Sequence, residues 1–337
     1  MSETRMIRRL PDLLIEPVVR GALAEALGRA GDITAQACIP EGARMRAVFA
    51  ARQPGVLAGI DCVRLSLLAL DPAAAVSARL HDGDAFEAGA VLVEAEADAR
   101  AFLAAERTAL NLLGRLCGVA TLTRAYVEAV AGTGARIADT RKTTPGLRAL
   151  EKHAVVCGGG VNHRFGLDDA ILIKDNHVAV CGGVGEAIRR ARAAAGHLVR
   201  LEIEVDGLDQ FDEALAEGPD VVMLDNFTPE MLREAVRRAR ASIGHLMKVE
   251  VEIDRLDQLE EALAEGPDVV MLDNFSLDDL RAAVAMTAGR AVLEASGGVT
   301  LDTVRAIAET GVDVISVGAL THSAPGLDIG LDIDQPA

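Results

Sequence analysis

From Ile137 onward, short apolar runs alternate with amphipathic segments along the chain. Apolar residues recur at helical spacing in Leu208–Glu217 and Met231–Ala241, whereas runs such as Val221–Asp225 are short and continuous. This alternation predicts parallel strands joined by crossover helices, and eight such strands suit a (βα)8 barrel. The strands that we expect are Arg136–Asp139, Ala170–Lys174, Arg200–Val205, Val221–Asp225, Lys248–Ile253, Val269–Asp273, Ala291–Ala295 and Val314–Val317.

The N-terminal part of the chain has a different pattern. Residues 1–30 have helical apolar spacing, and Gly28 and Gly31 are expected to end that helical stretch. Short segments bounded by Gly, Pro and Asp follow, and they predict a small α/β layer. Its expected elements are strands at Met45–Ala50 and Val91–Glu96 and a helix around Gly59–Leu70.

Two helices are predicted next, at Ala99–Leu116 and Ala120–Ala131, and we place the domain boundary near residue 117. The fold class is therefore α/β. We expect N-terminal helices and an α/β sandwich in residues 1–117, and an α/β barrel of parallel strands in residues 118–337.

Composition agrees with this fold class. The 337 residues allow about two domains. The chain has no Trp, one Tyr and seven Phe, so the core must consist of Ala, Val, Leu and Ile, which suits parallel strands buried under helices. No apolar stretch reaches the ~18 residues of a membrane span, and the N-terminus lacks an apolar signal region. The five Cys residues form no CxxC pair, which favours reduced thiols and a cytoplasmic location.

The net charge of −17 excludes a general attraction to nucleic acid or anionic membranes. Basic residues nevertheless gather in the middle of the chain. In an acidic protein such a group predicts a local anion pocket, although a solvated basic face paired with surface carboxylates is the alternative. The group comprises Arg141, Lys142, Arg148, Lys152, His153, His163, Arg164, Lys174 and His177.

Polar residues also recur at the C-terminal ends of the predicted strands, which is the end of a barrel that carries the active site. Arginine forks suit carboxylates and lysines act as point charges, so the cations fit a small ligand with several carboxylates or phosphates. The sequences EASGG and SVGAL, which include Gly298 and Ser316, end the last two strands and predict a phosphate loop. Glu204 and Asp225 could hold Mg²⁺ with a diphosphate, bind sugar hydroxyls, or simply pair with lysines.

One segment of the chain is repeated. The sequence EALAEGPDVVMLDNF occurs at 213–227 and again at 261–275, an offset of 48. At that offset the similarity extends over two units of two strands and two helices, at about 186–233 and 234–285. Chance does not produce such an identity, so we expect a duplication. Each unit places one Glu and one Asp at strand ends, namely Glu204 with Asp225 and Glu252 with Asp273.

The chain resembles quinolinate phosphoribosyltransferases, also called carboxylating nicotinate-nucleotide pyrophosphorylases. The resemblance covers nearly the whole chain and implies an N-terminal sandwich, an open α/β barrel and a dimer. It also implies the reaction of quinolinate with phosphoribosyl pyrophosphate and Mg²⁺ to give nicotinate mononucleotide, pyrophosphate and carbon dioxide. The matching motifs are AERTALNLLGRLCGVAT, TRKTTPGLRALEKHAVVCGGGVNHRFGLDDAILIKDNH, EIEV, VVMLDNF, EASGGVTLDTV and GVDVISVGALTHSAPGLDIGL.

The resemblance also implies residue roles. One cation, Arg107, would reach into the site from the neighbouring subunit of the dimer. The quinolinate-binding residues correspond to Arg107, Arg141, His163, Arg164 and Lys174. The phosphoribosyl side corresponds to Lys142 and to one acidic pair among Glu204, Asp225, Glu252 and Asp273, which would also hold Mg²⁺ with the diphosphate. The phosphate loop positions correspond to Ser296, Gly297 and Gly318.

The repeat departs from the family pattern, which has a single unit. Both copies could join the barrel and complete eight strands, which we favour because both copies have apolar faces to bury and closure removes sheet edges. Asp225 and Glu252 would then separate Glu204, beside Lys174, from Asp273, beside Ser296, and activity would weaken. Alternatively, one copy bulges out or swaps with another subunit.

Two other functions remain open at this stage. The chain could be a catalytically impaired or engineered scaffold that keeps the motifs. It could also be a related pyrophosphorylase with another pyridine substrate, although the full set of cations matches the two carboxylates of quinolinate.

Overall fold

The computed structural model describes residues 7–196, 198–242, 247–264 and 266–333. The start of the predicted N-terminal helical stretch lies outside this part, as do residues 243–246 and 265 of the second repeat unit. The chain forms two compact units, which we describe separately. Unit 1 comprises residues 1–128, 139–162 and 318–337, and unit 2 comprises residues 129–138 and 163–317. The domain boundary expected near residue 117 stays a prediction.

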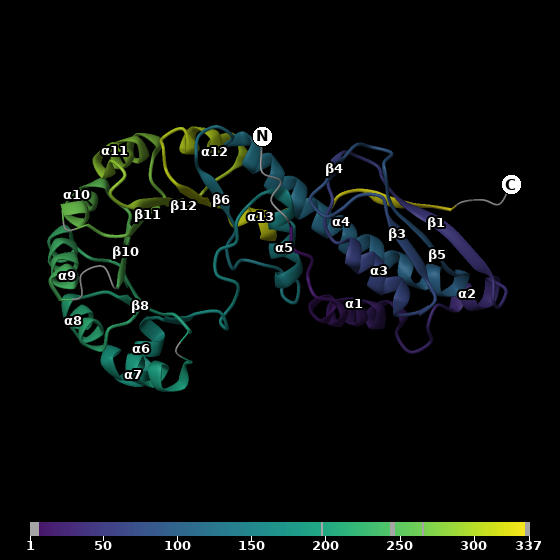
Figure 1. Ribbon diagram of the computed structural model, residues 1–337, viewed down its shortest axis with the longest axis horizontal. Helices are drawn as coiled ribbons and strands as arrows, with labels where there is room; N and C mark the ends of the chain where they lie inside the picture. The colour runs from purple at the N-terminus through teal and green to yellow at the C-terminus, as the bar shows by residue number, and fades with distance from the viewer. Residues whose placement is uncertain (1–6, 197, 243–246, 265, 334–337) are drawn as a thin grey trace. The chain divides into compact units, whose positions relative to one another are not determined.

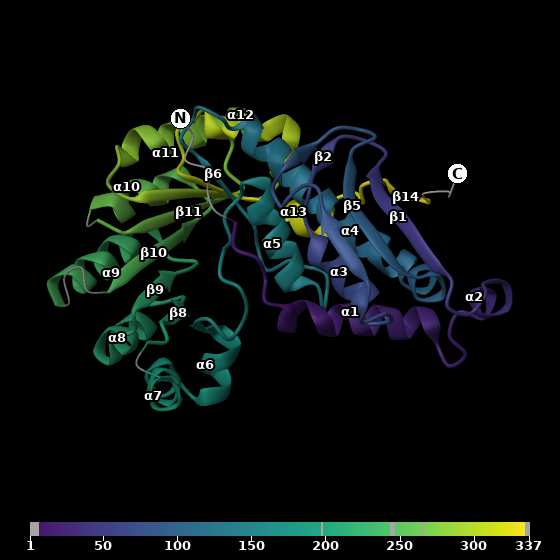
Figure 2. The same ribbon diagram turned by 45° about the vertical axis from the view of Figure 1, so that its right-hand side comes forward.

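Unit 1 contains an antiparallel sheet of strand order β14-β1-β5-β3 and a small pair of strands, β2 and β4. Figure 2 shows β14, in yellow, beside β1, in purple, so the last strand of the chain completes the first sheet. The helices are α1 (Asp12–Leu27), α2 (Ile33–Cys38), α3 (Ile60–Leu68), α4 (Ala99–Ala129), α5 (Arg148–Gly158) and α13 (Ala319–His322). The strands are β1 (Arg44–Ala51), β2 (Gly55–Val56), β3 (Ala75–Ala78), β4 (Ala85–Phe86), β5 (Val91–Asp98) and β14 (Ile329–Ile333).

Helix α4 is one continuous helix of 31 residues, so the prediction of two helices separated near residue 117 is wrong. The two predicted helices lie on either side of Gly118, and glycine weakens a helix in general. Here glycine serves a close contact instead. A Cβ on Gly118 would lie 1.9 Å from the carbonyl oxygen of Pro325, and one on Gly114 would lie 2.8 Å from that of Leu327. Only glycine lets the C-terminal segment pack this closely against α4.

Unit 2 is a curved parallel sheet with helices on its outer face (Figure 1). The strand order is β6-β13-β12-β11-β10-β9-β8-β7. Its strands are β6 (Arg136–Ala138), β7 (Ile171–Ile173), β8 (Leu201–Val205), β9 (Val221–Leu224), β10 (Lys248–Ile253), β11 (Val269–Asp273), β12 (Val292–Ser296) and β13 (Val314–Ser316). Its helices are α6 (Asp175–Cys181), α7 (Val184–Ala194), α8 (Leu208–Glu217), α9 (Pro229–Ser242), α10 (Leu256–Ala264), α11 (Leu277–Thr287) and α12 (Leu301–Ala308).

All eight strands predicted in this part are present in one sheet, which confirms the α/β fold class. Both repeat copies contribute to it: β8 and β9 come from the first copy, and β10 and β11 from the second. The arrangement in which one copy bulges out is therefore wrong. The expected closure of the sheet is not found among the described residues, where β6 and β7 are its two edges. Both edge strands have only three residues, which limits the unpaired backbone at each edge.

The two faces of this sheet differ in polarity. On β8, Leu201, Ile203 and Val205 are buried, whereas the alternate residues Glu202 and Glu204 are partly exposed. Strand β10 has the same alternation. Because successive side chains of a strand point to opposite faces, the apolar set packs under the helices and the carboxylates line the inner face. Within the described residues, we find no helix with the length and apolar character that a membrane crossing needs.

Candidate active site

The loop that carries Arg141 and Lys142 is held in place by buried ion pairs of unit 1. Asp139 precedes the loop and forms an ion pair of 2.6 Å with Lys152 of α5, and both side chains are buried. The side-chain amide of Asn162 donates to Asp139, with a distance of 2.9 Å. Lys152 was expected to be part of the anion pocket, and this expectation is wrong because its ammonium group is buried against Asp139.

A second buried carboxylate, Glu151, holds the other end of this loop. Its Oε2 accepts the backbone N–H of Thr144 at 2.9 Å, and its Oε1 accepts from Arg115 of α4 at 2.8 Å. Arg115 also donates to the backbone oxygens of Thr321 and Ala324. Sequence reasoning missed Arg115 and Glu151 as individual residues, although both lie within motifs of the family resemblance. The sequence signal that could have identified them is a charged residue on the apolar face of a predicted helix.

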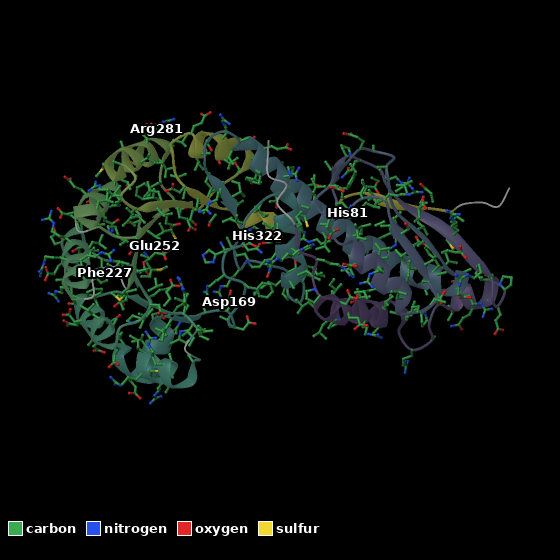
Figure 3. The ribbon with its side chains drawn as sticks, in the orientation of Figure 1. His81, Asp169, Phe227, Glu252, Arg281 and His322 are labelled. Carbon is green, nitrogen blue, oxygen red and sulfur yellow. The ribbon has the colours of Figure 1, made fainter. Side chains whose placement is uncertain are left out.

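Lys142 lies beside Gly318, at the start of α13. A Cβ on Gly318 would be 3.2 Å from Cδ of Lys142 and 3.3 Å from Nε2 of His322. The Thr321 hydroxyl donates to the backbone oxygen of Lys142 at 2.6 Å, which fixes the loop against α13. Unit 1 therefore brings together two residues predicted for the phosphoribosyl side and adds His322, which the sequence did not single out; Figure 3 labels it.

In unit 2, the cation Lys174 follows β7 and forms an ion pair of 2.5 Å with Glu204 of β8. The side chains are 41% and 19% exposed, so the pair is open to a ligand. Burial raises the pKa of Glu202 on β8, and the nearby Arg164 guanidinium opposes this shift. His163 is exposed, and its Nδ1 accepts the backbone N–H of Arg164 at 2.7 Å. Of the predicted quinolinate-binding residues, Lys174 thus lies at the end of β7, Arg164 lies near β8, and His163 contacts Arg164.

At the other end of the repeated region, Asp273 is the strand partner of Ser296 in the pairing of β11 with β12. The backbone N–H of Asn274 donates to the Ser296 carbonyl at 2.9 Å. Gly297 has a φ of 91°, and a Cβ there would strike the Asn274 side chain at 2.1 Å, so this turn requires glycine. Asp273 therefore lies next to the predicted phosphate loop.

Two other residues predicted for the phosphate loop, Gly298 and Ser316, have different surroundings. Gly298 also has a positive φ, of 60°. Ser316, at the end of β13, is buried and donates from its hydroxyl to Glu294 of β12 at 2.5 Å. A buried hydroxyl engaged in this way supports the strand ends, and the backbone at 296–298 is the part open to an anion.

Asp225 and Glu252 lie between these two groups and line a cavity of about 350 Å³ together with Asp273. Figure 3 shows Glu252 on the inner side of the curved sheet. Burial raises the pKa of Glu252, and the neighbouring carboxylates of Asp225 and Asp273 raise it further. The carboxyl of Glu250, one inward position earlier on β10, has a pKa raised to about 7 by burial and then by Glu202 and Glu294.

Arg107 projects from α4 in unit 1. Its side chain is 73% exposed and lies 3.8 Å from Glu106. It lines a cavity of about 370 Å³ with Asn111, Arg115 and the segment 326–329.

Family models match nearly all of the chain. The description "Quinolinate phosphoribosyl transferase, N-terminal domain" matches residues 32–117. The corresponding C-terminal domain description matches in two overlapping segments, residues 119–241 and 232–332.

Individual relatives agree with these matches. A carboxylating nicotinate-nucleotide pyrophosphorylase of Mycobacterium leprae is 43% identical over 320 residues, which cover 94% of this chain and 95% of that protein. A probable enzyme of the same name from Bacillus subtilis is 39% identical over 303 residues, 90% of this chain and 88% of that protein. Among solved structures, the nicotinate-nucleotide pyrophosphorylase of Francisella tularensis has a TM-score of 0.72 at 33% identity, covering 98% of this chain and all of that chain.

Proposed function

The chain belongs to the quinolinate phosphoribosyltransferase family, and we propose how its own residues carry out that family's reaction. The substrates are quinolinate and phosphoribosyl pyrophosphate, and the products are nicotinate mononucleotide, pyrophosphate and carbon dioxide. The chain is thus an enzyme of NAD biosynthesis, and neither the scaffold alternative nor reduced activity is supported by the comparisons. A cytoplasmic location stays a prediction.

The observation that carries the residue assignment is the open ion pair between Lys174 and Glu204 at the ends of β7 and β8. Quinolinate has two carboxylates, and a single cation cannot neutralise both. We assign Lys174, Arg164 and His163 to them, and we give Arg141 the same role on the basis of the family resemblance. Carboxylate binding would release Lys174 from Glu204 and free that carboxylate to face the ribose.

The chemistry is electrostatic. The pyridine nitrogen attacks C1 of the ribose while the bond from C1 to the pyrophosphate oxygen breaks, and positive charge develops on the sugar. Glu204 stabilises that charge, and Lys142 stabilises the departing pyrophosphate. Once the ring nitrogen is alkylated, the pyridinium accepts the electron pair left by the adjacent carboxylate as carbon dioxide departs. The ring carbon then takes a proton.

We infer that each copy of the repeat supplies one of the two functional carboxylates. Glu204 of the first copy has the cation neighbour, and Asp273 of the second copy has the phosphate-loop neighbour Ser296. Asp225 and Glu252 lie between these two positions, and the main influences on Glu252 are burial and the carboxylates of Asp225 and Asp273. Three strand steps separate Glu204 from Asp273, roughly 14 Å along the sheet at ~4.8 Å per step, so the two carboxylates serve different ends of phosphoribosyl pyrophosphate.

Mg²⁺ fits the donors at the phosphate end, because carboxylate oxygens are the hard ligands that it prefers. Asp273 is the residue that we assign to it, with Asp225 and Glu252 on the same cavity. When bound, the ion supplies positive charge to the diphosphate oxygens.

A homodimer is part of the proposal. Arg107 is highly exposed on α4, so it is placed to act in the site of a second copy rather than to support its own unit. Mixing of an Arg107→Ala variant with a Lys174→Ala variant tests this, because a mixed dimer regains one complete site. If neither variant alone has activity and the mixture has none either, donation of Arg107 between subunits is wrong.

The test of the function is steady-state release of carbon dioxide from quinolinate, dependent on phosphoribosyl pyrophosphate. Nicotinate serves as the comparison substrate because it lacks the second carboxylate. We expect turnover with quinolinate and a much weaker response to nicotinate. Equal turnover of both would contradict the assignment of the cations to two carboxylates.

A further inference from the structure

We propose that Asp82, His153 and Cys157 form a site for a divalent transition metal ion of the zinc class. Their ligand atoms lie within 4.8 Å of one another. The sequence analysis counted His153 in the basic group of the predicted anion pocket, but the structure places it against Asp82, and none of the three residues has a role in the phosphoribosyl transfer proposed above. All three belong to unit 1, where the side chains of His153 and Asp82 are 10% and 21% exposed and Cys157 is buried.

Two of the ligands share one helix. His153 and Cys157 are four residues apart on α5, so they lie one above the other on the same face of the helix. Asp82 comes from the turn before β4, and its Oδ2 lies 3.0 Å from Nε2 of His153. The same carboxylate accepts the backbone N–H groups of Gly59 and Ile60 at 3.0 and 3.3 Å. These bonds from the start of α3 fix the Asp82 carboxylate in orientation, as supporting hydrogen bonds do for metal-binding carboxylates.

The three donor types select the class of ion. Thiolate, imidazole and carboxylate together suit Zn²⁺, whereas Mg²⁺ and Ca²⁺ take oxygen ligands. Zinc ligands at ~2.0–2.3 Å from the ion lie about 3.3–3.8 Å apart in a tetrahedron, so small side-chain rotations close the site. One thiolate and one carboxylate also balance the charge of the ion, which suits a poorly solvated position.

The thiol must lose its proton for this site to form. Burial raises the pKa of Cys157, and the nearby Asp82 carboxylate raises it further. A divalent cation at the thiol reverses this balance and displaces the proton. Metal affinity therefore rises with pH, and one proton leaves per ion bound.

The site has an entry path. A cavity of about 240 Å³ is lined by Asp82 and His153 together with Ile60, His81 and Arg9. Figure 3 labels His81, whose side chain is 92% exposed. The cavity therefore reaches two of the three proposed ligands. The bound ion would tie α5 to the turn before β4 within unit 1.

Cobalt(II) titration of the metal-free, reduced full-length protein tests the proposal, because a thiolate–cobalt bond has its own charge-transfer absorption. We expect saturation at one equivalent, displacement by Zn²⁺, and tighter binding at pH 8 than at pH 6. Cys157→Ser should lose the absorption band, and the matched control Cys181→Ser should keep it. No saturable binding, or a band that persists in Cys157→Ser, would overturn the site.

A second variant covers the case in which Cys157→Ser does not fold. His153→Gln keeps a polar side chain opposite Asp82 but removes the imidazole ligand. Loss of a ligand should weaken Co²⁺ binding by at least ~10-fold, and the thermal stabilisation of the native protein by Zn²⁺ should fall with it. Unchanged Co²⁺ affinity in this variant contradicts the proposal. Circular dichroism checks that each variant is folded, and none of these readouts depends on the transferase reaction.

Discussion

The two copies of the repeat have nearly the same sequence but different neighbours. Their local structures agree: Asn226 and Asn274, at equivalent positions, have φ values of 57° and 55°. Glu204 of the first copy, however, is paired with Lys174, whereas its counterpart Glu252 faces the carboxylates of Asp225 and Asp273. Local conformation follows the sequence of the unit, and the chemistry of each carboxylate follows from the strand beside it.

The same contrast appears at Glu202 and Glu250, the preceding inward-facing residues of β8 and β10. Burial raises the pKa of both Glu202 and Glu250. Arg164 and Lys174 oppose the shift at Glu202, while carboxylates on β8 and β12 increase it at Glu250. Repulsion between carboxylates is therefore stronger in the second copy. Its first strand lies in the middle of the sheet, away from the edge that carries the cations.

The largest expected effect distinguishes Glu204 from Glu252. Glu204→Gln removes the carboxylate beside Lys174 that we assign to the ribose. We expect kcat/KM for quinolinate to fall about 100-fold or more, in line with the loss of one electrostatic group at a reacting centre. Glu252→Gln removes a counterpart that faces the carboxylates of Asp225 and Asp273, and its kcat/KM should stay within about threefold of that of the native enzyme. Equal losses in both variants would break the contrast between the copies.

The next effect is on stability and concerns Glu250. A carboxyl whose pKa rises on folding binds more protons in the folded state, so its contribution to stability falls as pH rises from about 4.5 to about 7. In metal-free buffer, Glu250→Gln should therefore raise the free energy of unfolding at pH 8 by up to about 3 kcal/mol and change it little at pH 4.

Urea unfolding at the two pH values measures this difference. Glu202→Gln is the matched control from the first copy and should give a smaller gain at pH 8, because Arg164 and Lys174 partly compensate its charge. A larger gain for Glu202→Gln than for Glu250→Gln would contradict the ranking.

The smallest effect concerns a pair of aspartates at the starts of the strands. Asp268 forms ion pairs of 2.8 Å with Arg240 and 2.7 Å with Lys248, whereas its counterpart Asp220 lies 3.8 Å from Arg192. These partners, against the opposing effect of burial, lower the pKa of Asp268, so its stabilisation is present above about pH 4 and is lost as pH falls below that value.

We expect Asp268→Asn to cost about 1–2 kcal/mol of unfolding free energy at pH 7 and less at pH 3. Asp220→Asn should cost less than Asp268→Asn at pH 7. Thermal unfolding of the two variants at both pH values measures this, and a cost for Asp268→Asn that does not shrink at pH 3 would point to a packing effect instead of charge.

The sequence predicted the strands of unit 2 well because each is a short apolar run between amphipathic helices. It also placed Lys174 beside Glu204 and Asp273 beside Ser296, since adjacent parallel strands end at the same edge. It failed at α4, because the contact of Gly118 with Pro325 joins residues far apart in the chain. For the same reason, the pairing of β14 with β1 had no local signal.

The sequence identified the types of residue in the site, but not which of their side chains are buried or what they contact. Lys152 counted as an available cation in the sequence, and only the fold reveals its buried partner Asp139. The support from Arg115 and Glu151 was missed for the same reason, since it depends on which helix faces pack together. That the repeat arose by duplication stays a prediction.

The central claim is that the acidic residue on the phosphate side comes from the second copy. The most direct test compares Asp273→Asn with Asp225→Asn in one assay, as kcat/KM for phosphoribosyl pyrophosphate at saturating quinolinate and Mg²⁺. Our account predicts a loss of about 100-fold or more for Asp273→Asn, at the strand beside Ser296, and a change within about threefold for Asp225→Asn. A loss confined to Asp225→Asn would contradict it, because the first copy alone would then supply both carboxylates.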